Sequence, residues 1–328
     1  MTARTATTAR RTSRTARARL AATAAVAATA VTGTAMLALA APAASAAVQL
    51  NCTAVPSACG YPDATNSGVP AGTALLAVPG QVSSGLGWHY VSSGYVAVTG
   101  SGAVLSGLYI PYNVDVTASN VTIKNSKIVT SGSFVVSLRH TSNVTITHST
   151  ISGANATTGR AGVDISDIYG DSTGMNITGN NISNFKTAVQ VTTGVISGNY
   201  IHDPGYVSGD HTNGIFDTGT TQALSITGNT ILNSFGQTDA ISLDDSTPYS
   251  PIANKTVTGN LLGGGSYTIY GGNSLGNTST NMHIDNNRFS QAYFSRSGQY
   301  GPVAYYNTSA TNTWTGNFYD STGANIPW

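Results

Sequence analysis

The segment "LSITGNTI", residues 224–231, alternates apolar and polar side chains on either side of a central Gly-Asn pair. Alternation with a period of two is typical of β-strands, and Gly-Asn favours a tight turn. The segment therefore predicts two short strands separated by a corner. So short a unit cannot bury its apolar side chains alone, which implies that it packs against other copies of itself.

Copies of this unit recur through most of the chain. They read "VTIKNSKI" (121–128), "VTITHSTI" (144–151), "MNITGNNI" (175–182), "GVISGNYI" (194–201), "TVTGNLL" (256–262), "MHIDNNRF" (282–289) and "TWTGNFY" (313–319), with a looser copy ending at Ile110. The first apolar anchors, spaced 18 to 31 residues apart, are Leu105, Ile123, Ile146, Ile177, Ile196, Ile226, Val257, Ile284 and Trp314. Short, irregular β-repeats exclude a helical repeat and also a propeller, whose blades are longer and more regular. They predict an all-β chain folded as a right-handed parallel β-helix, a solenoid of roughly nine coils with Asn stacked at the turns.

The first 46 residues differ from the rest of the chain. Six arginines without an acid fall within residues 4–19, an Ala/Val/Leu-rich run covers residues 20–41, and Ala-Ser-Ala occupies residues 44–46. Basic, apolar and small residues in this order are typical of a secretory signal peptide. We therefore expect residues 1–46 to be a signal peptide for export by either the general secretory (Sec) pathway or the twin-arginine pathway. The mature protein is expected to be secreted and extracellular.

The remaining chain is mildly acidic, with eight Lys and Arg residues against thirteen Asp and no Glu. Nucleic acids and anionic membranes both need a basic patch, so neither is a predicted partner. The length suits one domain, with an N-terminal cap and first strands in residues 47–100 and the β-helix in residues 101–328. Cys52 and Cys59, in an exported protein, predict one disulfide that ties down this cap. We expect a monomer.

The repeated "ITGN" units, the export signal and the sequence "HTNGI" (211–215) together resemble the secreted right-handed parallel β-helix proteins of the pectin-lyase-like superfamily. The resemblance covers residues 91–319. It implies the fold and a protein that acts on carbohydrate. Because this fold hosts lyases, hydrolases, epimerases, tailspikes and adhesins, the resemblance does not decide the reaction.

The second strand of each coil can be aligned by its apolar residues. The residues taken as inward are Val163, Ile165, Val189, Val191, Ile215, Ile241, Leu243, Ile269, Val303 and Tyr305. Alternation then places two rows outward: Asp164, Gln190, Phe216, Ser242, Tyr270 and Ala304 in one, and Ser166, Thr192, Thr218, Asp244, Gly272 and Tyr306 in the next. Polar side chains interleaved with aromatic rings suit a sugar-binding groove. We predict that Gln190, Phe216, Asp244, Tyr270 and Tyr306 bind substrate there.

The same alignment places Thr187, Asn213, Asp239 and Tyr267 two residues before the inward anchors. Asn213 and Asp239 are therefore expected on adjacent coils, about 5 Å apart. Asp210 and His211 lie just before Asn213 and complete a dense cluster of ionisable and amide side chains. We predict that His211, Asp239, Asp210 and Asn213 are catalytic. No cofactor is predicted; an ion such as Ca²⁺ held by Asp210, His211 and Asp239 is the alternative.

Hydrolysis is the first of two reactions open to this cluster. An inverting hydrolase needs two carboxyl groups about 6.5–9.5 Å apart, and Asp239 would have to pair with Asp210, Asp217 or Asp244. Asn213 stands where the pectin hydrolases that this motif resembles carry Asp. An amide cannot serve as a general acid or base, so this departure counts against hydrolysis.

Elimination is the second reaction. A lyase needs a base and a group that neutralises the uronate carboxylate, for which His211 or Tyr270 and Asn213 are the candidates. The bases of earlier coils, Arg139, Arg160 and Lys186, are expected to be too distant. We predict a secreted enzyme that cleaves polysaccharide or oligosaccharide, a lyase or a glycoside hydrolase. The alternative is a non-catalytic carbohydrate-binding or cell-envelope protein.

Overall fold

A computed structural model describes residues 51–243, 251–276 and 279–328. The chain divides into two units, residues 1–46 and residues 47–328, and the expected signal peptide lies outside the described residues. Two short 3-10 helices, η1 (Cys52–Ala54) and η2 (Pro56–Cys59), precede thirty β-strands. Within these ranges, no helix has the length and apolar character needed to span a membrane.

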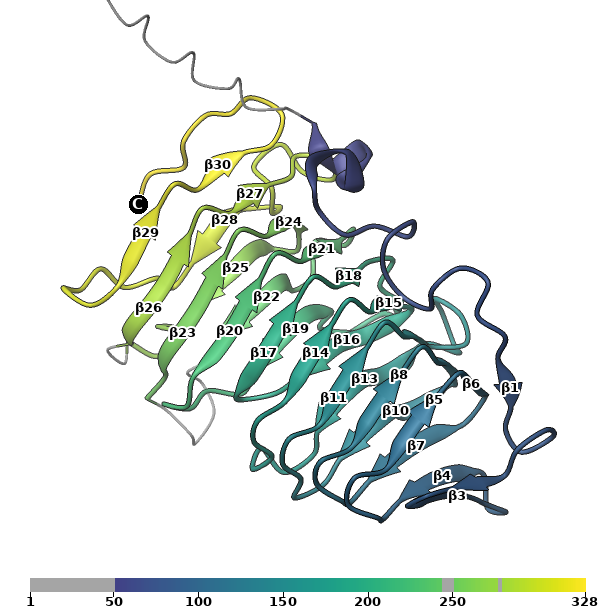
Figure 1. The fold of residues 1–328 in the computed structure, drawn as a ribbon. Helices are drawn as coiled ribbons and strands as arrows, with labels where there is room; N and C mark the ends of the chain where they lie inside the picture. The colour runs from purple at the N-terminus through teal and green to yellow at the C-terminus, as the bar shows by residue number, and fades with distance from the viewer. Residues whose placement is uncertain (1–50, 244–250, 277–278) are drawn as a thin grey trace, which may run out of the picture. The chain divides into compact units, whose positions relative to one another are not determined.

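The strands form three sheets, and each complete coil of the chain adds one strand to each sheet in turn (Figure 1). Sheet I contains β5 (Val104–Ser106), β8 (Thr122–Lys124), β11 (Thr145–Thr147), β14 (Asn176–Thr178), β17 (Gly194–Ser197), β20 (Leu224–Thr227), β23 (Ala253–Thr258), β26 (Thr280–Asp285) and β29 (Thr313–Thr315). Sheet II contains β1 (Leu76–Ala77), β6 (Leu108–Ile110), β9 (Lys127–Val129), β12 (Thr150–Ser152), β15 (Asn181–Ser183), β18 (Tyr200–Ile201), β21 (Thr230–Asn233), β24 (Leu261–Gly264), β27 (Arg288–Phe289) and β30 (Phe318–Tyr319). Sheet III contains β2 (Ser84–Gly85), β3 (Trp88–Val91), β4 (Tyr95–Val98), β7 (Asn113–Val116), β10 (Gly132–Leu138), β13 (Ala161–Asp167), β16 (Phe185–Gln190), β19 (Asn213–Asp217), β22 (Asp239–Leu243), β25 (Tyr267–Gly271) and β28 (Gly301–Ala304).

The predicted all-β parallel solenoid is confirmed. The nine repeat anchors occupy the nine strands of sheet I, and neighbouring anchors pair directly, as Ile146 does with Ile123 and Ile177. Eight coils contribute a strand to all three sheets, whereas the last coil contributes only β29 and β30 within the described residues. The number of complete coils is therefore slightly below the predicted nine.

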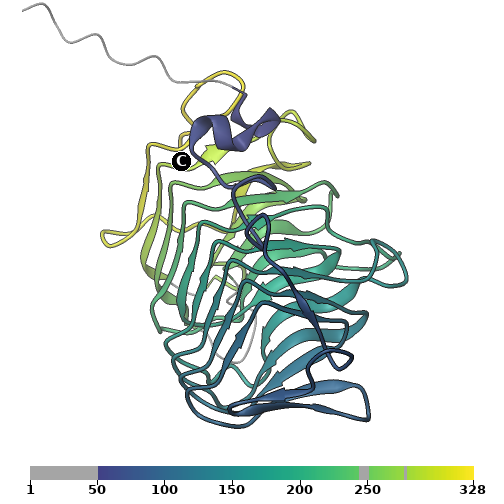
Figure 2. The same cartoon turned by 45° about the vertical axis from the view of Figure 1, so that its right-hand side comes forward.

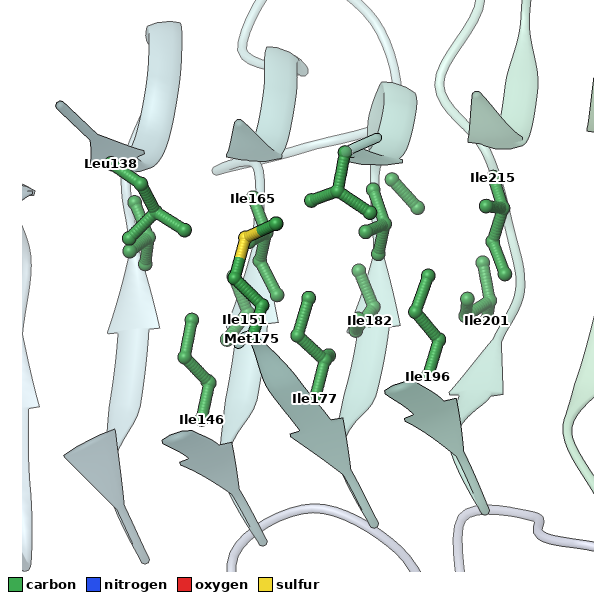
Figure 3. Close-up of a cluster of buried hydrophobic side chains, with 14 of the residues drawn as sticks. Leu138, Ile146, Ile151, Ile165, Met175, Ile177, Ile182, Ile196, Ile201 and Ile215 are labelled. Carbon is green, nitrogen blue, oxygen red and sulfur yellow. The ribbon is translucent and has the colours of Figure 1, made fainter. Parts of the chain in front are cut away.

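The interior is a set of stacked aliphatic columns, one for each sheet (Figure 3). The labelled isoleucines of these columns are at most 1% exposed: Ile146, Ile177 and Ile196 from sheet I, Ile151, Ile182 and Ile201 from sheet II, and Ile165 and Ile215 from sheet III. Full burial of each such side chain contributes about 1.5–3 kcal/mol. The coils therefore gain this stabilisation only by stacking, as the repeat predicts.

A ladder of buried asparagines joins the coils at the corner between sheets I and II. Its rungs are Asn180, Asn199, Asn229, Asn260, Asn287 and Asn317, each at most 2% exposed. The Asn229 side-chain amide donates to the Asn260 side-chain oxygen (3.0 Å) and to the Ile196 carbonyl (2.9 Å). The backbone and side-chain amides of Asn199 both donate to the Asn229 oxygen (2.9 Å each). Each rung therefore satisfies the backbone of a buried corner and sets the distance between coils.

The residue before each rung explains the "[GN]-N" signature. Gly228 has φ +63°, and Gly179, Gly198, Gly259 and Gly316 have similar values. Only glycine adopts this left-handed conformation without steric cost, with Asn as the usual second choice. Asn286 takes the same place at φ +56° in "DNN". The first residue of each pair thus forms the turn, and the Asn that follows stabilises it with hydrogen bonds.

The N-terminal segment links the last coil to the first. The predicted Cys52–Cys59 disulfide forms, but the Cys52 backbone amide donates to the Asp320 carboxylate (2.9 Å), just beyond β30. Farther along, the Gly68 amide donates to the Gly179 carbonyl (2.9 Å), and β1 then pairs with β6. Figure 2 shows this segment in dark blue, crossing the coils. The disulfide therefore anchors the segment to the last coil, whereas the antiparallel strands β2, β3 and β4 cover the first coil.

Replacing a rung of the ladder should destabilise the solenoid strongly. Asn229→Ala removes hydrogen bonds on both neighbouring coils and leaves buried polar groups unpaired, so we expect a loss of about 3 kcal/mol or more in the free energy of unfolding. Asn176→Ala is the matched control, since Asn176 lies in another copy of the repeat, in β14, and is exposed; it should cost no more than about 0.5 kcal/mol. Urea denaturation measures both, and equal losses would contradict the role of the ladder.

An interior position of β13, in sheet III, carries a carboxyl group. Asp164 is fully buried, neither of its oxygens has a hydrogen-bond partner, and burial raises its pKa well above the ordinary value. The aligned positions of the two neighbouring strands hold Val135 and Ala188. The folded protein therefore binds this proton more tightly than the unfolded chain does, which lowers stability as the pH rises above about 4.

Asp164→Asn should therefore raise the melting temperature at neutral pH. At a pH below the ordinary pKa of Asp, the carboxyl group is protonated in both folded and unfolded chains, so the variant should gain little there. The difference in melting temperature should grow between about pH 4 and pH 7. A difference that stays constant over this range would show that the charge of Asp164 is not its cause.

Candidate functional site

A groove of about 730 Å³ follows the outer face of sheet III. Its lining residues are Ser133, Phe134, Gly162, Val163, Lys186, Thr187, Gln190, His211, Asn213, Phe216, Thr238, Asp239, Ser242, Leu243, Tyr270, Gly272, Ser274 and Tyr305. From β10 to β25 it crosses six neighbouring strands, which corresponds to about 24 Å at ~4.8 Å per strand. The groove therefore has the extended form that a chain-like ligand requires.

The shape of the sheet III strands produces this groove. In β19, Asn213 and Phe216 both line it, while Gly214 and Ile215 between them are buried. Strict alternation cannot place residues three apart on one face, so two consecutive residues turn inward here. A Cβ on Gly214 would lie 2.4 Å from the Ala240 carbonyl oxygen, which explains the glycine of "NGI". Because a small residue and an aliphatic residue point inward between them, Asn213 and Phe216 can both face the groove and belong to two separate rows of outer side chains.

Two rows of outer side chains meet the groove, but only one of them is a predicted outward row. In the other predicted outward row, Ser166 and Thr192 are buried, and Gly272 is the one described member that lines the groove. Asn213 pairs with Thr187 on one side and with Asp239 on the other, as the alignment predicts. The first predicted outward row holds Gln190, Phe216, Ser242, Tyr270 and Ala304 in register. The predicted substrate-binding residues Gln190, Phe216 and Tyr270 therefore line one groove.

The alignment is wrong in β13. Val163, expected to point inward, pairs with Thr187 and lines the groove, whereas Asp164, expected to point outward, is buried. Ser166 is the residue that pairs with Gln190. Because Val163 is apolar, the sequence alignment took it as an inward residue and therefore placed β13 two positions out of register with β16.

The prediction for Tyr306 is also wrong. Tyr306 is 6% exposed and packs against Trp314 and Trp328, whereas Tyr305, expected to point inward, is 50% exposed and lines the groove. β28 ends at Ala304, and Tyr305 has φ +56°, so strand alternation no longer applies beyond the strand end. Tyr305 stacks on Tyr270 with the ring centroids 5.6 Å apart. Asp244, another predicted substrate-binding residue, lies outside the described residues.

Four chemically active side chains lie where the strands begin: Lys186, His211, Asn213 and Asp239. His211 is exposed, whereas Asp239 is 1% exposed and lies at the base of the groove. Lys186 was expected to be too distant. It immediately precedes Thr187, the partner of Asn213, and this register relation is the signal that could have identified it.

The phenol of Tyr270 extends this cluster across the groove. Burial raises the pKa of Tyr270, and the negative charge of Asp239 raises it further. The hydroxyl group is therefore held in its protonated form at neutral pH. Tyr270 is suited to donate a proton or a hydrogen bond and is a poor candidate for a base.

Asp210 does not line the groove, although it belongs to the predicted catalytic cluster. Its two carboxylate oxygens accept hydrogen bonds from the Nε and Nη2 atoms of Arg160, at 2.6 Å each, and Oδ2 also accepts from the Val207 amide (2.8 Å). A carboxylate held in this two-point ion pair is not available to a substrate. Asp210 therefore stabilises the loop that leads into β19.

Asp217 and Lys255 form a second ion pair, inside the solenoid. Both side chains are fully buried, and the Lys255 ammonium lies 2.9 Å from the Asp217 carboxylate and also donates to the Thr192 and Gln222 carbonyls. Burial lowers the pKa of Lys255, and the charge of Asp217 opposes this effect. The Asp217 carboxylate also accepts from the Gly219 amide (3.1 Å). Asp217 therefore stabilises the turn after β19 from within.

Asp239 is consequently the one carboxylate that lines the groove in the described part of the chain. A hydrolase with two carboxylates has no second one among these residues. Nor do the described residues contain a group of three or more His, Cys, Asp or Glu side chains arranged to hold a metal ion. The side chains present are suited to proton transfer and to binding a carboxylate or a hydroxyl group.

Asp210→Ala should lower stability because it leaves the mostly buried Arg160 guanidinium without its partner. We expect a loss of about 2 kcal/mol or more in the free energy of unfolding. Asp171→Ala is the control, since the Asp171 side chain is about half exposed (49%) and should contribute little. Unchanged stability in Asp210→Ala would contradict this structural role.

No protein-family model matches the sequence, and no significant match was found among curated proteins or solved structures.

Proposed function

We propose that this protein binds a polysaccharide along the groove of sheet III and cleaves it by β-elimination at a uronate residue. The observation that carries the proposal is the groove itself, in which aromatic rings flank a central cluster of proton-transfer groups. Phe134, Phe216, Tyr270 and Tyr305 provide faces on which pyranose rings can stack. Such rings, spaced along parallel strands, suit a chain of repeating units.

The residues divide into three roles. His211 is exposed in the groove just before β19, and its imidazole takes the proton beside the uronate carboxylate. The Lys186 ammonium and the Asn213 amide bind that carboxylate and stabilise the charge that develops there. Tyr270, kept protonated by burial and by Asp239, donates to the departing glycosidic oxygen.

The proposal extends to the setting of the protein. The parallel solenoid and the groove agree with membership of the pectin-lyase-like superfamily. A disulfide agrees with an oxidising, extracellular compartment, as does the signal-like sequence of residues 1–46. The polysaccharide would then be met outside the cell.

His211→Ala and Tyr270→Phe should each lower kcat about a hundredfold or more, because each removes a proton-transfer group. The melting temperature should change little, since His211 is exposed and the Phe ring retains the packing of Tyr270. His89→Ala, at an exposed position of β3, is the control and should retain full activity. The assay follows ultraviolet absorbance of the unsaturated product over a panel of uronate-containing glycans.

Two results would count against elimination. Unaltered turnover in both variants would show that neither residue takes part. New reducing ends without ultraviolet absorbance would indicate hydrolysis instead.

A groove that binds carbohydrate without cleaving it is the second candidate. It is favoured by the presence of a single groove carboxylate, Asp239, among the described residues. Retention of a glycan with no product of either kind would support it. In that case Tyr270→Ala should weaken binding, whereas His211→Ala should not.

A further inference from the structure

A second cleft lies at the loops that lead into sheet III. It has a volume of about 590 Å³, and its walls contain three aromatic side chains, Tyr206, Phe235 and Tyr300, and two amides, Gln237 and Gln299. Tyr206 and Phe235 stack with centroids 5.0 Å apart, and Tyr300 is 55% exposed. Among the described residues that line this cleft, none is acidic or basic.

Hydrogen bonds hold these loops in place. The Tyr206 amide donates to the Ala156 carbonyl (3.0 Å), and the Arg160–Asp210 ion pair fixes the end of the same loop. The Ser266 hydroxyl donates to the Gly236 carbonyl (2.9 Å), and the Tyr300 amide donates to the Ser266 carbonyl (2.8 Å). A cleft built in this way loses little conformational freedom when a ligand binds.

The cleft adjoins the groove. Gln237 lines the cleft, and the next two residues, Thr238 and Asp239, line the groove. A series of aromatic contacts joins the two: Tyr300 to Tyr267 at 5.9 Å and Tyr267 to Tyr270 at 5.8 Å between centroids. A ligand in the groove can therefore extend into the cleft beside the proposed reaction centre.

We propose that this cleft binds an uncharged sugar branch of the polysaccharide whose backbone occupies the groove, an inference that rests on the proposed function. Aromatic faces bind the apolar face of a pyranose or furanose ring, and the planar amides of Gln237 and Gln299 bind its hydroxyl groups. The absence of charged side chains selects a neutral sugar over a uronate, in contrast to the groove, where Lys186 lies. The substrate is therefore a branched chain with an acidic backbone and neutral side chains.

The test compares each branched polysaccharide with its own enzymatically debranched backbone. A suitable pair is rhamnogalacturonan with and without its neutral side chains. Affinity is measured for the wild type and for Tyr300→Ala and Phe235→Leu, which alter the cleft. Tyr109→Ala is the control, because Tyr109 is also an exposed tyrosine (38%) but lies on β6.

The wild type should bind a branched chain more tightly than its backbone, and Tyr300→Ala should lower this preference about five- to tenfold. Phe235→Leu should act in the same direction, and Tyr109→Ala should not. Equal affinity for both forms, with Tyr270→Ala weakening both, would overturn the branch site and leave the groove intact. No binding of any glycan by the wild type would overturn the proposed function, and the branch site with it.

Discussion

The ladder of asparagines between sheets I and II is the interaction on which the rest of the structure depends. A coil of this solenoid turns sharply at an interior corner, where backbone groups are removed from water and must be paired. Each Asn side chain pairs two of them, as at Asn229: its amide donates to a backbone carbonyl of the preceding coil, and its oxygen accepts from the backbone amide of the preceding rung. The same side-chain amide also donates to the oxygen of the next rung. Because every rung repeats the same geometry, the coils stack in register from Asn180 to Asn317.

The register of the coils at this corner also determines which residues become neighbours on sheet III. Sheet III lies on the same coils, so residues 24 to 29 positions apart in the chain become neighbours on the groove strands β10 to β25. Asn213 and Asp239 meet in this way. The inward pairs of small and aliphatic residues, such as Gly214 and Ile215, then leave a residue from each of the two outer rows facing the groove in β16, β19 and β22. The scaffold thus supplies spacing and orientation, and the outer residues supply the chemistry.

Charged residues that take no part in the groove stabilise its surroundings. Arg160 and Asp210 hold the loop before β19, and Asp217 and Lys255 hold the turn after it. Both pairs bring together residues 38 to 50 positions apart and use up carboxylates that would otherwise be candidates for catalysis. Among the described residues, the groups that remain where the groove strands begin are Lys186, His211, Asn213 and Asp239, and the proposed elimination rests on this combination.

The sequence alone determined the repeat, the fold class, the disulfide partners and the adjacency of Asn213 and Asp239. These follow from local patterns, since the alternation of apolar residues recurs along the chain and the "[GN]-N" corner recurs in six successive coils. Only the tertiary structure decided whether each charged side chain forms an ion pair or lines the groove, because a partner on another coil cannot be identified from the local sequence pattern. Asp210 is paired with Arg160. Lys186, which was expected to be distant, lines the groove. The tertiary structure also decided the orientation of Val163, Asp164 and Tyr306, where the alternation used for the sequence alignment fails. In β13 two consecutive residues point inward. Before Tyr306, the left-handed Tyr305 follows the end of β28.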